Sequence, residues 1–96
     1  MTILTLIGKP DCHLCDVAHG IVDDVIAGLP ERLADGIDVR EASILDDPAL
    51  YEQWWEKIPV ILIDGGLHAH WRVSADRLRD ALVTASAVPT SAGVAS

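Results

Sequence analysis

One segment decides the fold: Gly8-Lys9-Pro10-Asp11-Cys12-His13-Leu14-Cys15-Asp16. It contains both cysteines of the chain, separated by two residues. An aliphatic run at residues 3–7 precedes the segment and predicts a buried strand, and a helical pattern follows it. A C-x-x-C pair between a strand and the start of a helix is typical of a redox-active thiol pair.

The expected position of Cys12 explains how such a pair becomes reactive. Cys12 falls where the first unpaired helix N–H groups point, so these donors and the helix dipole stabilise its thiolate. Sites of this kind lower a cysteine pKa from ~8.5 to roughly 3.5–7.5. Cys15 lies on the same side of the first turn, within disulfide reach. We therefore expect one cysteine to attack and the other to resolve.

Two other interpretations of the cysteine pair stay open. A C-x-x-C can be half of a zinc site, for which His13 or His19 is a third ligand, but such a site needs four ligands and the sequence offers no second C-x-x-C. The pair can also be buried and inert. The strand-to-helix context favours redox chemistry, with no bound metal.

Bulk composition limits the class of protein. The chain has 96 residues, half of them hydrophobic, and a net charge of −8. This predicts one domain, and the acidity argues against nucleic acid binding, which needs a basic surface. Because we find neither an apolar run of ~20 residues nor a signal peptide, we expect a cytoplasmic protein without membrane contact, and a monomer. In a reducing compartment a lone cysteine pair is more often catalytic or metal-binding than structural.

Hydrophobic periodicity predicts the first half of the domain. Residues 1–8 form a strand, and apolar residues recur with helical spacing from Cys15 to Leu29. Cys15 lies on that apolar stripe and should be the more buried thiol, whereas Cys12 precedes it and should be exposed. Asp11 is the helix N-cap or the residue before it. Residues 31–36 connect, with a short turn of their own, to a strand at 37–44.

Start signals and turn signals predict the second half. Asp47 and Pro48 begin a helix whose aromatic residues, as far as Trp55, are expected to pack on the sheet. An exposed tryptophan that serves as a docking surface is the alternative. A strand at residues 58–63 returns through a hairpin turn at 64–66 into a strand at 67–73. Ser74 caps a last helix. The domain is predicted to span residues 1–85, and residues 86–96 are predicted to form a disordered tail.

The resulting order is β-α-β-α-β-β-α, an α/β thioredoxin-like fold with a four-stranded mixed sheet. On this pattern the chain resembles the glutaredoxins, and especially the small bacterial glutaredoxin-like proteins. Two motifs carry the resemblance: Lys9-Pro10-Asp11-Cys12-His13-Leu14-Cys15 is similar to the glutaredoxin K-P-x-C-x-x-C, and Lys57-Ile58-Pro59-Val60 to the segment with the family's cis-proline. The resemblance covers about residues 1–83.

The resemblance implies a thiol–disulfide oxidoreductase and assigns roles to its residues. Cys12 is the nucleophile and Cys15 the resolving thiol. Lys9 provides a positive charge beside the thiolate and a partner for a substrate carboxylate. Pro59 is cis and abuts the cysteine pair, and the backbone of Ile58 pairs with a bound peptide. Partners are a disulfide-containing protein or small thiol substrate, with a reductase or small thiol as electron donor.

The chain also departs from the glutaredoxin pattern. His13 and Leu14 occupy substrate-binding positions where glutaredoxins usually carry proline and tyrosine. The glycine pair that glutaredoxins carry near their last helix is replaced here by residues 69–72, Ala-His-Trp-Arg. No resident cofactor is expected. Glutathione or another low-molecular-weight thiol can serve as co-substrate, but these departures predict slow or absent turnover with glutathione alone. Cluster or metal binding and a non-catalytic adaptor are the alternative functions.

Overall fold

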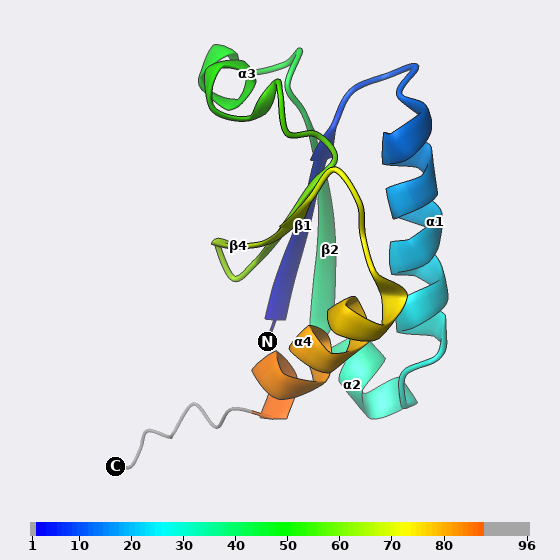
Figure 1. Cartoon of the computed structure of the whole chain (residues 1–96). Helices are drawn as coiled ribbons and strands as arrows, with labels where there is room; N and C mark the ends of the chain where they lie inside the picture. The colour runs from blue at the N-terminus through cyan, green and yellow to red at the C-terminus, as the bar shows by residue number, and fades with distance from the viewer. Residues whose placement is uncertain (1, 88–96) are drawn as a thin grey trace.

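The computed structural model describes residues 2–87 (Figure 1). Within these residues the chain forms four strands and four helices, and the second helix is a short one in the connection where the sequence predicts a turn. In chain order the elements are β1 (Thr2–Gly8), α1 (His13–Ala27), α2 (Glu31–Asp35), β2 (Ile37–Ser43), α3 (Pro48–Trp54), β3 (Val60–Ile63), β4 (Gly66–His70) and α4 (Ala75–Ala87).

The strands form one mixed sheet in the order β2-β1-β3-β4. β1 pairs with β2 in parallel and with β3 antiparallel, and β3 and β4 form an antiparallel hairpin. The parallel pair is connected through α1, as a βαβ unit requires. The α/β class and the thioredoxin-like arrangement expected from the sequence are confirmed.

Helices cover both faces of the sheet, with α1 and α4 on one face and α3 on the other (Figure 1). Alternation along β1 explains why both faces are apolar: Leu4 and Leu6 belong to the cluster with α1 and α4, and Ile7 to the cluster with α3. Trp54 closes that second, smaller cluster. The cysteine-containing segment, residues 8–16, begins where β1 ends, so its base is held by an inner strand of the sheet.

Local capping signals are observed at two predicted helix starts. The Asp47 carboxylate accepts a hydrogen bond from the Ala49 N–H at 2.9 Å, and Pro48 occupies the first helical position. The Ser74 hydroxyl accepts one from the Arg77 N–H at 3.3 Å. Each bond satisfies an N–H that the first turn of a helix leaves without a partner.

Two predictions about the second half of the chain are wrong. The returning strand does not reach residue 73: β4 ends at His70, because Trp71 adopts a left-handed backbone with φ 64°, which an extended strand cannot contain. The aromatic residues of α3 do not all pack on the sheet, since Trp54 is buried but Tyr51 and Trp55 are about half exposed. A helix has room for only one stripe on a sheet, and Trp54 takes it.

The last helix extends to Ala87, beyond the predicted domain end at residue 85. The rest of the predicted tail, residues 88–96, lies outside the described residues. Within residues 2–87, every helix is too short or too polar to cross a lipid bilayer.

Candidate functional site

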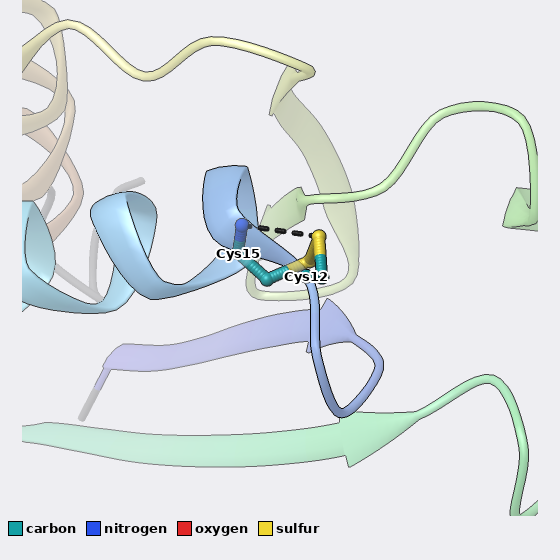
Figure 2. Close-up of a disulfide and its surroundings, with 2 residues drawn as sticks. All are labelled: Cys12 and Cys15. Atoms are coloured by element: carbon teal, nitrogen blue, oxygen red, sulfur yellow. Dashed lines mark hydrogen bonds between the residues drawn. A yellow bond between two sulfur atoms is a disulfide. The ribbon is translucent and has the colours of Figure 1, made fainter.

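A disulfide joins Cys12 and Cys15 at the start of α1 (Figure 2). The two Cα atoms are 5.1 Å apart, inside the range that a disulfide requires. Cys12 ends the segment between β1 and α1, and Cys15 lies in the first turn of α1, at the end of the sheet where β1 ends. The predicted pairing of Cys12 with Cys15 is therefore present in the structure.

Cys12 is the N-cap of α1. Its backbone is extended, with φ −112° and ψ 108°, and its sulfur accepts a hydrogen bond from the Cys15 N–H at 3.2 Å (Figure 2). Asp11 is thus the residue before the cap, and it takes a left-handed conformation with φ 58° that turns the chain into the helix. Sulfur in the N-cap position receives the same backbone donor that an aspartate or serine cap receives. In the reduced protein this donor would stabilise a thiolate at Cys12.

The two cysteines differ in burial in the predicted sense. Cys15 is only 8% exposed, whereas Cys12 is half-buried. Cys15 also lies directly against Gly8 at the end of β1: a β-carbon built on Gly8 would stand 2.9 Å from the Cys15 sulfur. Glycine at this position therefore makes room for the buried thiol.

Lys9 lines the same hollow as the buried cysteine. Lys9 and Cys15 both line a hollow of about 390 Å³ between α1 and β2, together with Asp16, His19 and Glu41. Lys9 is exposed, so its ammonium group remains accessible to an anionic group of a substrate. Its proposed contact with a substrate carboxylate stays a prediction.

His19, which the sequence allows as a metal ligand, lies between two carboxylates. Its Nδ1 lies 3.2 Å from an Asp23 carboxylate oxygen, and its Nε2 lies 3.3 Å from one of Glu41. Asp23 is four residues along α1, but Glu41 comes from β2, so only the tertiary structure brings this pair together. Among residues 2–87 no group of three or more histidine, cysteine, aspartate or glutamate side chains is arranged to hold a metal ion.

Pro59 lies at the same end of the sheet as the cysteines. The Ile58–Pro59 peptide bond is cis, and Pro59 is almost fully buried. Since Ile7 pairs with Val60 in the antiparallel register, Pro59 is level with Gly8, the residue that touches Cys15. Ile58 is half-buried against the cluster beneath α3. A direct contact of Pro59 with the disulfide, and backbone pairing by Ile58, stay predictions.

His13 and Leu14 are exposed in the first turn of α1, and Leu14 retains 48% of its accessible surface. Both therefore lie where a bound molecule could reach them. Their role in substrate binding is not tested by the geometry.

Known proteins with a similar sequence or structure share this fold. Residues 3–83 match the family model of the glutaredoxin-like domain (DUF836). The chain belongs to this glutaredoxin-like family. A solved structural-genomics target from X. campestris, XcR50, is 32% identical, with a TM-score of 0.65 over 84% of this chain and 96% of that one. A mutant thioredoxin from Halobacterium salinarum NRC-1 has a TM-score of 0.61 over 86% of this chain and 73% of that one; at 15% identity it shows the fold alone.

Curated relatives match over a shorter stretch. An uncharacterized protein of Mycobacterium tuberculosis (strain ATCC 25618 / H37Rv) is 40% identical over 43 residues. That match spans 45% of this chain and 44% of the relative.

Trp71 is a feature of this glutaredoxin-like domain that sequence reasoning missed. Its N–H donates to the carbonyl oxygens of Pro59, at 2.9 Å, and Lys57, at 3.2 Å, and its indole N–H donates to the Glu56 carbonyl at 2.6 Å. These bonds tie the end of β4 to the segment that contains the cis-proline. The only sequence signal is indirect, since Trp71 stands in the region where glutaredoxins carry a glycine pair.

A second hollow, of about 350 Å³, lies between β4 and the start of α4 and is lined by His68, His70 and Arg77 among others. Burial, and then the positive charge of Arg77, lower the pKa of His68. Both histidines are half-buried. Neither cysteine lines this hollow.

Proposed function

We propose that this glutaredoxin-like protein is a thiol–disulfide oxidoreductase that cycles between a Cys12–Cys15 dithiol and the disulfide. The observation that carries the proposal is the asymmetry of the pair: the Cys12 sulfur caps α1 and receives the Cys15 N–H, whereas Cys15 is buried against Gly8. An accessible, stabilised thiolate suits attack, and a buried neighbouring thiol suits resolution.

In the first step the Cys12 thiolate attacks one sulfur of a substrate disulfide. A Cys12–substrate disulfide forms, and the other substrate sulfur leaves as a thiolate that takes up a proton. Cys15, after loss of its proton, then attacks the Cys12 sulfur; the Cys12–Cys15 bond forms and the second substrate thiol is released. Two electrons and two protons pass from the protein to the substrate, and a donor dithiol or two thiols restore the reduced pair.

Substrate contacts follow from the segments around the pair. Lys9 offers a positive charge next to Cys15, and the backbone around Ile58 offers hydrogen-bonding groups for an extended peptide in the manner of strand addition. His13 and Leu14 complete the exposed rim. We propose that disulfide-containing proteins and small disulfides reach Cys12 across this rim, in the reducing cytoplasm.

Glutathione is a poor electron donor in this proposal. The tyrosine between the cysteines and the glycine pair near the last helix, which contact glutathione in glutaredoxins, are absent, and Trp71 occupies the latter region. Losing two or three polar contacts of roughly 0.5–1.5 kcal/mol each weakens binding about tenfold or more. We therefore expect slow turnover with glutathione alone and faster turnover with a protein reductase or a different small thiol.

The test uses two single-cysteine variants and one disulfide substrate. Cys12→Ser should abolish exchange, and Cys15→Ser should accumulate a mixed disulfide that mass spectrometry locates at Cys12. The reductants are then compared on the unmodified protein in a coupled assay. Exchange that persists in Cys12→Ser would overturn the mechanism, and fast saturable turnover with low-millimolar glutathione would overturn the choice of donor.

A further inference from the structure

Two aromatic rings, one on α3 and one on the residue that caps its C-terminus, stack on each other at the protein surface. The Tyr51 and Trp55 ring centroids are 6.1 Å apart and the ring planes differ by 8°. Their exposed fractions are 46% and 51%, and Leu45, just before α3, is 62% exposed. A hollow of about 450 Å³ runs beside them and is lined by Ile44, Leu45, Pro48, Tyr51, Glu52 and Trp55.

These two exposed rings are not part of the hydrophobic cores. Trp54 already fills the cluster between α3 and the sheet, so the rings of Tyr51 and Trp55 contribute little to the core. Large apolar side chains that gather around one hollow on a single domain are typical of an interaction site. We name Leu45, Tyr51, Glu52 and Trp55 the acidic aromatic patch.

The segment that carries the patch is mainly acidic, although Lys57 at its end places its ammonium 5.8 Å from the centroid of the buried Trp54 ring. Between Arg40 and Lys57 the chain contains five acidic residues and no lysine or arginine. Glu52 lines the hollow itself, and Asp46, Asp47 and Glu56 are exposed nearby in the sequence. With a net charge of −8 on the whole chain, this surface attracts a basic partner and repels a second copy of itself.

A hydrogen bond connects Ile44, the residue before the patch, to the cysteine-containing segment. The Ile44 N–H donates to the Gly8 carbonyl at 2.9 Å, and Gly8 is the residue against which Cys15 lies. Ile44 also lines the hollow. In Figure 1, α3 and the start of α1 lie at the same end of the sheet. A protein whose disulfide binds at Cys12 can therefore also contact α3.

We propose that the acidic aromatic patch docks a basic segment of the disulfide-bearing protein substrate. An arginine or lysine of that segment lies over the Tyr51 and Trp55 rings, where cation–π attraction and the Glu52 carboxylate act on the same charge. The apolar part of the segment covers Leu45. This inference rests on the proposed oxidoreductase function and names the chemistry of its substrate.

The experiment uses two peptides that carry one cysteine as a pyridyl disulfide. They differ only in two flanking positions, which are arginine in one peptide and glutamate in the other. The reduced protein becomes the Cys12–Cys15 disulfide, and peptide thiol and coloured pyridinethione are released, so no other reductant is needed. Dipyridyl disulfide is too small to contact α3 while it reacts at Cys12. Its rate therefore reports thiol–disulfide exchange without docking.

We expect the arginine peptide to react about three- to tenfold faster than the glutamate peptide at low salt, and this ratio to fall as salt is added. Glu52→Lys and Trp55→Ser should each bring the ratio close to one without changing the rate with dipyridyl disulfide. Asp80→Lys, on the exposed side of α4, changes the net charge equally, and Leu67→Ser removes an exposed apolar side chain on β4. Both control variants should keep the ratio of the parent protein.

The outcomes separate the docking site from the reaction. If dipyridyl disulfide is not reduced, the oxidoreductase function itself fails. If it is reduced but both peptides react equally, or if Asp80→Lys lowers the ratio as much as Glu52→Lys, the patch is not the docking site. Dimers in sedimentation experiments that disappear in Trp55→Ser would instead make the patch a contact between two copies and overturn the proposal.

Discussion

Replacement of Gly8 by alanine tests the contact that holds the buried thiol. A β-carbon at this position would stand 2.9 Å from the Cys15 sulfur and 3.1 Å from its β-carbon, whereas ordinary contact begins at 3.4 Å. The sulfur must therefore move by about 0.5 Å, inside a site that is only 8% exposed. Extra methyl groups in well-packed sites cost about 1–3 kcal/mol. For a domain of this size each kcal/mol lowers the Tm by about 4–8 °C.

The measurement is urea unfolding of the reduced proteins, which excludes any effect of the disulfide on the unfolded chain. Gly8→Ala should lower the free energy of unfolding by about 1–3 kcal/mol. In a Cys15→Ala background the sulfur is gone and only the 3.1 Å contact remains, so the cost should fall by at least about 0.5 kcal/mol. This difference shows that the loss of stability comes from the contact with the Cys15 sulfur and not from an effect of alanine on β1 itself.

Gly20→Ala is the matched control. Gly20 lies inside α1 and has nothing within 4 Å of its built β-carbon, so alanine should stabilise the protein by about 0.5–1 kcal/mol. Our interpretation of the Gly8 contact is refuted if Gly8→Ala is as stable as the parent, or if its cost is the same with and without the Cys15 sulfur.

Three further predictions concern Cys12, Trp71 and His68. In Cys15→Ser, the thiolate absorbance of Cys12 should titrate with a pKa below the free-cysteine ~8.5, because the helix-start N–H groups and Lys9 outweigh Asp11 and Asp16; a pKa at or above that value would show that the carboxylates prevail. Trp71→Phe keeps the ring but loses the indole bond to the Glu56 carbonyl, so the free energy of unfolding should drop by about 0.5–1.5 kcal/mol, and an unchanged value would mean that water replaces the bond. His68 has a lowered pKa when folded, so the unfolded chain binds its proton first as the pH falls below 6.5 and stability is lost; His68→Gln should make unfolding midpoints fall less between pH 7 and 5, and equal slopes would contradict this.

Features that depend on neighbours within one helical turn or one hairpin can be predicted from the sequence. The C-x-x-C spacing after an aliphatic run placed the disulfide, and the apolar stripe of the helix predicted that Cys15 is the buried thiol. Asp47 and Ser74 cap helices with their own side chains, three or fewer residues from the N–H groups they bind. The hairpin turn near Gly65, with φ 85°, needs a residue that tolerates a left-handed backbone.

Other features needed the tertiary structure because their partners come from distant segments. β4 ends at His70 because the Trp71 N–H turns to the carbonyl oxygens of Lys57 and Pro59, which no local pattern predicts. His19 lies between Asp23 of its own helix and Glu41 of β2, a strand that only the parallel pairing brings near. The favoured prediction from the sequence was that the aromatic residues of this helix pack on the sheet, but the sheet has room for one of them. Exclusion by Trp54 leaves Tyr51 and Trp55 at the surface, and that competition for space is decided by the packed fold alone.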